Sequence, residues 1–161
     1  MPSDSSILSI SGISSSSSTS SSPFSHSNAN PDLAVSVESC FFSSCASEMN
    51  GGSICITSVT SFCISNSSFT DCSSASSGGA LFVSLNTSLS RCAYSDTLPL
   101  LDSCTFTRCH SKGDGGSVHL TSTCPAFIKH CSFFSSSSDH NGGAIYWSVS
   151  STQRDLQTWI Y

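Results

Sequence analysis

The chain has 161 residues, a net charge of −5 and charged side chains at only 9% of its positions. Its five Lys and Arg residues are too few to neutralise the phosphates along a nucleic acid, which argues against nucleic-acid binding. No apolar run approaches the roughly 20 residues of a membrane-spanning helix, and the N-terminus lacks the basic start and apolar core of a signal peptide. Serine is abundant and is a weak helix former, so we expect an all-β chain.

Residues 1–32 are predicted to be a disordered, Ser-rich leader. Ser14 to Ser18 and Ser20 to Ser22 form unbroken serine runs, and Pro23 and Pro31 interrupt any regular element. This composition buries too little apolar surface to fold alone. We interpret the segment as a linker or stalk.

Residues 33–161 contain four copies of one unit, each marked by a Gly-Gly pair. The pairs begin at Gly51, Gly78, Gly115 and Gly142. Their separations of 27, 37 and 27 residues indicate a 27-residue period with one ten-residue insertion, which we place as a loop at 84–98. Insertions in solenoids collect on one face, so we expect contact with a partner there.

Apolar residues recur at fixed offsets from each Gly-Gly pair. A phenylalanine precedes every pair, and alternating apolar residues follow it, which predicts two short strands per repeat with a third strand or turn in the remainder. One such unit cannot bury its own apolar face, so the units must stack. The phenylalanines are Phe42, Phe69, Phe106 and Phe133.

The stacked units predict a parallel β-helix of about four 27-residue coils, with the right-handed sense that crossover connections prefer. A β-propeller blade needs about 40 residues, more than this period supplies. The phenylalanines then form a core column rather than a sugar-stacking surface. We also expect possible end-to-end association through uncapped coils.

Two motifs resemble the repeats of the chlamydial polymorphic outer membrane proteins. Gly142-Gly143-Ala144-Ile145 matches the Gly-Gly-Ala element of that family, and Phe69-Thr70-Asp71-Cys72 matches its Phe-x-x-Asn element with Cys in place of Asn. The Ser- and Cys-rich composition also resembles β-helix proteins of anaerobic protists. The resemblance covers roughly residues 33–150 and implies a pectin-lyase-like fold with a secreted or surface-exposed, adhesin-like role. It also suggests that the chain is a segment of a longer protein.

The cysteines fall at repeated positions. Cys45, Cys72 and Cys109 share one position, and Cys40, Cys104 and Cys131 share another in which Ser67 replaces one cysteine. We favour free, buried thiols that pack as small apolar groups. Disulfides between stacked neighbours remain an alternative. A metal site with Cys104, Cys109 and His110 is a weaker one because a closed zinc site needs a fourth ligand.

We expect a non-enzymatic surface or extracellular segment that presents loops for binding or adhesion, with glycans or surface proteins as partners. We predict no catalytic residue, no cofactor and no metal. One alternative is a carbohydrate-active lyase or hydrolase, which would need converging carboxylates, whereas the acidic residues here are scattered over the repeats. Asp114 with His119, or Arg108, could share an outer face.

Tyr146, Trp147 and Trp159 could meet a glycan or partner or cover a further coil. The other alternative is a structural spacer in a larger repeat protein. The scattered acidic residues include Glu38, Glu48, Asp71, Asp102, Asp114 and Asp139.

Overall fold

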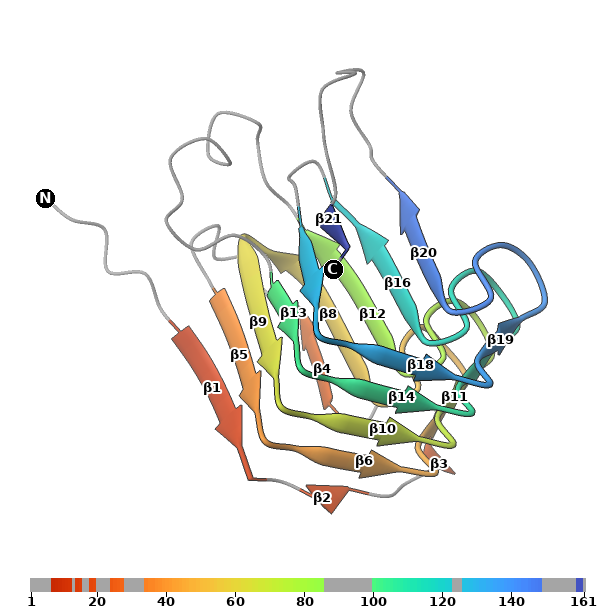
Figure 1. The fold of residues 1–161 in the computed structure, drawn as a ribbon, viewed down its shortest axis with the longest axis horizontal. Helices are drawn as coiled ribbons and strands as arrows, with labels where there is room; N and C mark the ends of the chain where they lie inside the picture. Colours follow the sequence, from red (N-terminus) through yellow and green to blue (C-terminus); the bar gives the residue numbers. More distant parts are fainter. Residues whose placement is uncertain are drawn as a thin grey trace, which may run out of the picture.

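The computed structural model describes residues 7–12, 14–15, 18–19, 24–27, 34–85, 100–122, 126–148 and 159–160. Every regular element in these residues is a β-strand, and the strands form four parallel sheets, here named A to D (Figure 1). The chain passes through sheets A, B, C and D in turn and then returns to sheet A. This path is a parallel solenoid.

The sheets differ in strand length but have the same strand order along the solenoid. Sheet A contains β1 (Ile7–Ser11), β5 (Ala34–Glu38), β9 (Ser61–Ser65), β13 (Leu100–Asp102), β17 (Phe127–Lys129) and β21 (Trp159–Ile160). Sheet B contains β2 (Ser14–Ser15), β6 (Phe41–Ser43), β10 (Ser68–Thr70), β14 (Thr105–Thr107) and β18 (Ser132–Phe134). Sheet C contains β3 (Ser18–Thr19), β7 (Ala46–Ser47), β11 (Ser73–Ser74), β15 (His110–Ser111) and β19 (Ser137–Ser138). Sheet D contains β4 (Phe24–Ser27), β8 (Ile54–Val59), β12 (Leu81–Leu85), β16 (Val118–Thr121) and β20 (Ile145–Ser148).

Four coils correspond to the four sequence repeats: β5–β8, β9–β12, β13–β16 and β17–β20. We call them coils 1 to 4. The all-β parallel solenoid of about four coils is therefore confirmed, whereas the right-handed sense stays a prediction. Each coil contains four strands rather than the two or three that the alternation predicted. The reason lies at two corners, where the backbone turns between short strands.

Both corners use non-glycine residues in the left-handed backbone region. The φ angles lie between 49° and 54°, a region that side chains with a Cβ enter at a cost. The residue after each corner turns inward. The residues at the corner between sheets A and B are Ser39, Asn66, Ser103 and His130, and those between sheets B and C are Ser44, Asp71, Arg108 and Ser135.

The Gly-Gly pairs form the turn between sheets C and D. The two positions of a pair require glycine for different reasons. The first glycine has a positive φ, as at Gly78 (71°), which glycine adopts without strain. The second has no room for a side chain because the next coil lies against it. A Cβ on Gly79 would collide with the backbone oxygen of Gly116 and lie 2.5 Å from that of His110.

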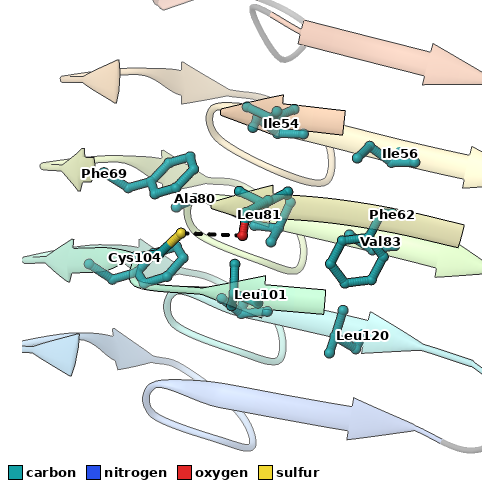
Figure 2. Packing of buried hydrophobic residues seen from close by; sticks show 14 of the residues in the cluster. Ile54, Ile56, Phe62, Phe69, Ala80, Leu81, Val83, Leu101, Cys104 and Leu120 are labelled. Atoms are coloured by element: carbon teal, nitrogen blue, oxygen red, sulfur yellow. Dashed lines mark hydrogen bonds between the residues drawn. The ribbon is translucent and has the colours of Figure 1, made fainter. Parts of the chain in front are cut away.

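The phenylalanine column is a core ladder, as the sequence predicted. The four phenylalanines pair in register across sheet B. Their ring centroids are 5.1, 4.7 and 4.9 Å apart, and successive ring planes differ by no more than 6°. Inward residues of the other sheets complete the core, including Ile54, Leu81 and Leu101, which are fully buried (Figure 2).

Part of the predicted leader pairs with the solenoid. Strands β1 to β4 lie within residues 7–27 and pair in parallel with β5 to β8. Leu8 and Ile10 align with Val35 and Val37. The rest of the leader lies outside the described residues. So does most of the predicted loop at 84–98, since Ser84 and Leu85 still belong to β12.

Candidate functional site

Within coils 1 to 4, the length of the chain varies at only one of the four junctions. The passages from sheet A through B and C to D have the same length in coils 1 to 4, because the register partners of two adjacent coils keep one constant offset up to Thr57, Ser84, Thr121 and Ser148 in sheet D. The return from sheet D to sheet A differs. We count this return from the residue after Thr57 or its register partners to the residue before Cys63 or its register partners. It then comprises residues 58–62, 85–99, 122–126 and 149–158 in coils 1 to 4. We call these four connections the variable edge.

The described strand ends that border the variable edge lie along one side of the solenoid. Strands of sheet D end there and strands of sheet A begin there, near the top of the view in Figure 1. The predicted insertion is therefore the 85–99 connection, and the 149–158 connection is also longer than those of coils 1 and 3. Partner contact at the insertion stays a prediction, because 86–99 lies outside the described residues.

The outer face of sheet D carries a ladder of mixed side chains beside this edge. Phe82 pairs in register with Cys55 on one side and His119 on the other, and His119 pairs with Tyr146. The Phe82 and His119 ring centroids are 4.9 Å apart, and those of His119 and Tyr146 are 5.0 Å apart. We call these four residues the outer column. Cys55, Phe82 and Tyr146 are half-buried.

A row of hydroxyl side chains runs parallel to the outer column and nearer to the variable edge. Two positions further along each strand the same outward face carries Ser or Thr, because side chains alternate between the faces of a strand. These residues pair in register and are all half-buried. The row consists of Thr57, Ser84, Thr121 and Ser148.

His119 is the most buried member of the outer column. Only 8% of its surface is exposed, and its Nε2 lies 3.2 Å from Oγ1 of Thr121. Its Nδ1 is buried and has no hydrogen-bond partner among the described residues. Burial lowers the pKa of His119 because it penalises the charged imidazolium. The ring is therefore neutral at pH 7 and acts in packing.

The outer face of sheet A becomes more apolar along the solenoid axis. Ser36 pairs with Cys63, Cys63 with Leu100, and Leu100 with Phe127. Cys63, Leu100 and Phe127 are half-buried. Burial is the largest cause that raises the pKa of the Cys63 thiol, followed by the charges of Glu38 and Asp102. Half-buried apolar side chains thus flank the variable edge on both sheets.

The carboxylates singled out in the sequence do not converge. Asp71 accepts two hydrogen bonds from Arg108, at 2.6 Å from Nε and 2.7 Å from Nη2. Asp102 lies 3.0 Å from Nδ1 of His130 and 3.4 Å from Nζ of Lys129. These contacts lower the pKa of both carboxyl groups, with the Arg108 and His130 hydrogen bonds as the largest causes.

Asp114 occupies a third place, just before a Gly-Gly pair. Its carboxylate accepts hydrogen bonds from the backbone N–H and the side-chain amide of Asn141, at 3.0 and 2.9 Å. The backbone hydrogen bond from Asn141 is the largest cause that lowers the pKa of Asp114. Each of the three carboxylates therefore has its own local partner and stays ionised near neutral pH.

The inward cysteines stabilise the corners. Each follows a left-handed corner residue, and its thiol donates to the carbonyl oxygen two residues earlier, as from Cys72 to Thr70 (3.4 Å) and from Cys104 to Asp102 (3.3 Å). A second contact reaches the previous coil, as from Cys104 to Ile64 (3.6 Å). Figure 2 includes the thiol of Cys104 among the core side chains. Ser67 replaces cysteine with a 2.8 Å hydrogen bond to Ser65.

Cys55, Cys63, Cys72, Cys104, Cys109 and Cys131 are free thiols, and Cys92 and Cys124 lie outside the described residues. The weaker alternative of a metal site does not assemble: Cys104 and Cys109 are buried, whereas His110 points outward with 42% of its side chain exposed. Within the described ranges, no group of three or more His, Cys, Asp or Glu side chains could hold a metal ion.

Sequence reasoning missed the outer column. It used the inward residues of each sheet D strand and passed over the residue between them, because the four outward residues differ in type. Period-two alternation after each Gly-Gly pair was the available signal. It also separates Tyr146, which points outward in the outer column, from Trp147, which packs partly buried against the core.

No protein-family model, curated protein or solved structure matches this chain. In the part of the chain that the structure describes, no helix has the length and apolar character needed to span a membrane.

Proposed function

We propose that this chain is a non-enzymatic segment of a surface or extracellular solenoid that binds glycan chains along the variable edge and the outer face of sheet D. The observation that carries the proposal is that length variation among coils 1 to 4 is confined to one junction. A solenoid can lengthen a coil there without disturbing its core, and such connections form the binding faces of repeat proteins.

The chemistry of the outer face of sheet D favours glycans among the expected partners. Its hydroxyl row and outer column carry no charged side chain at pH 7, since burial keeps His119 neutral. Adjacent coils are about 4.8 Å apart, a spacing comparable to the length of one pyranose residue. A glycan lying along the solenoid axis would meet one hydroxyl and one outer-column side chain per sugar.

The resemblance of the Gly-Gly-Ala and Phe-x-x-Cys elements to chlamydial polymorphic outer membrane protein repeats supports a surface role. That family combines a pectin-lyase-like β-helix with an adhesin-like role. The parallel solenoid observed here is compatible with both expectations.

The carboxylates support binding over the alternative of carbohydrate cleavage. A glycosidase needs one carboxylic acid with a raised pKa beside a second carboxylate. The pKa values of Asp71, Asp102 and Asp114 are all lowered, and each carboxylate belongs to a separate corner or turn.

A glycan array tests the proposal. The purified chain would be compared with a variant in which residues 85–99 are replaced by the sequence of residues 58–62, the matching connection of coil 1. We expect at least one glycan to be retained by the chain and lost by the variant, with the circular dichroism spectrum unchanged. Asp71 lies at the corner between sheets B and C, away from the variable edge. Asp71→Asn therefore serves as the control, and we expect it to bind the same glycans as the unmodified chain.

Two results would overturn the proposal. An array on which the chain retains no glycan would favour the structural spacer. Release of soluble products from a retained polysaccharide would favour the carbohydrate-active enzyme.

A further inference from the structure

Two inward thiols of adjacent coils occupy equivalent positions in the register. Cys104 belongs to coil 3 and Cys131 to coil 4, and the strands on both sides of them pair in register. The backbone N–H of Ser132 donates to the carbonyl oxygen of Cys104 at 2.9 Å. Paired parallel strands lie about 4.8 Å apart, which is within the Cα separation of about 4.4–6.8 Å that a disulfide spans.

The two thiols differ in their access to solvent. Cys104 is 1% exposed, and Cys40, Cys45, Cys72 and Cys109 are 2% exposed or less. Cys131 is half-buried instead. Among the described cysteines that point inward, it alone can meet a dissolved oxidant. A reachable thiol above a buried partner is the arrangement of a redox-active pair with a resolving cysteine.

The interaction between the thiols also shifts their two pKa values in opposite directions. The interaction with the Cys104 thiol lowers the pKa of Cys131, and the same interaction is the largest cause that raises the pKa of Cys104. The thiolate is the nucleophilic form of cysteine. The more exposed thiol is thus also the more reactive one.

We propose that Cys131 and Cys104 form a disulfide that joins coil 4 to coil 3 when the protein meets a peroxide. The Cys131 thiolate attacks one peroxide oxygen, the O–O bond breaks, and the products are a Cys131 sulfenic acid and hydroxide. The Cys104 sulfur then attacks the sulfenic sulfur, forms the S–S bond and displaces hydroxide, which takes the Cys104 proton. Two thiols are oxidised and hydrogen peroxide is reduced to two waters.

Coil 4 is the part of the repeat region that gains most from such a link. Its core residues Cys131, Phe133, Ile145 and Trp147 are only partly buried, whereas Phe106 and Val118 in coil 3 are fully buried. The disulfide would hold β17 to β20 against coil 3, whose core residues are more deeply buried. Oxidation would therefore protect the outermost described coil from local opening.

Peptide mapping tests the proposal. The full chain would be treated with hydrogen peroxide, alkylated under native conditions, digested and analysed by mass spectrometry without reduction. We expect a peptide pair linked through Cys104 and Cys131, reversible by dithiothreitol. Cys72 and Cys109 form a register-matched pair in which both thiols are fully buried, and we expect them to stay reduced until the chain is denatured.

Three variants and one independent measurement sharpen the test. Cys131→Ser should abolish the link, Cys104→Ser should leave a Cys131 sulfenic acid that dimedone labels, and Cys63→Ser should change nothing. Amide hydrogen exchange in residues 132–148 should slow at least severalfold on oxidation. The proposal is overturned if the unmodified chain accumulates Cys131 sulfenic or sulfinic acid without the link, or if Cys131 stays reduced while Cys55 or Cys63 reacts.

Discussion

The structure contains two ladders of stacked side chains that follow opposite rules. Inside sheet B the same residue, phenylalanine, recurs in all four coils, with ring planes within 6° of each other. Outside sheet D the outer column changes residue in every coil, and its ring planes differ by 26° and 40°. The inner ladder is fixed by close packing. The outer one is free to vary, which is why we place function there.

This comparison predicts that truncating one ring costs far more in the inner ladder. Phe106→Ala should lower the free energy of unfolding by about 3–5 kcal/mol, because Phe106 is fully buried and stacked on both sides. Phe82→Ala in the half-buried outer column is the matched control and should cost clearly less. Urea unfolding monitored by circular dichroism measures both, and similar losses would contradict the distinction between the ladders.

The Gly-Gly turns give a second comparison, between an internal coil and the outermost one. Gly79→Ala should destabilise the chain by about 1–3 kcal/mol, because a Cβ would meet backbone atoms of the next coil that cannot move aside. Gly143→Ala occupies the same position in coil 4, where the nearest atom is the Ser136 oxygen at 3.9 Å, so its unfolding midpoint should be unchanged or slightly higher. Equal losses in the two variants would show that the coil above imposes no constraint.

The outer column should respond to pH through His119. Burial lowers the pKa of this histidine below its ordinary value of 6.5, so the unfolded chain binds the proton more readily than the folded one. Stability should therefore be full above about pH 6.5 and fall as the pH drops below it. Urea midpoints at pH 7.5 and 5.5 test this in the chain and in His119→Gln. The variant should have the smaller difference, and an equal difference would refute the assignment.

The exposed Asp71–Arg108 pair should have the smallest effect. Its side chains are 43% and 58% exposed, so solvent and salt screen their attraction. Arg108→Gln should leave the urea midpoint unchanged within error at physiological salt. A clear loss at both low and high salt would mean that this pair contributes to the corner beyond its charge.

The repeat period, the phenylalanine column and the solenoid could be predicted because they depend on residues that are the same in every coil. The two left-handed corners could not, since Ser39, Arg108 and His130 share no residue type that signals a positive φ. Pairing of β1 to β4 was also missed. The serine runs that form β2 and β3 carry no apolar alternation, although Leu8 and Ile10 do align with Val35 and Val37.

The candidate site was predicted only in part. The insertion at 84–98 was recognised as an interruption of the period. The outer column was not, because Cys55, Phe82, His119 and Tyr146 have nothing in common except their place in the register. Recognising them requires knowing which face of sheet D is turned outward.

The second glycine of each pair has a consequence for how such a solenoid can grow. The space that forbids a side chain at Gly52, Gly79 or Gly116 is filled by backbone of the following coil. Each coil therefore determines which residue the preceding coil can have at the second glycine position, and does not restrict that position in itself. A 27-residue module grafted beyond coil 4 would turn Gly143 from a tolerant position into an obligatory one, while its own second glycine would be open to substitution.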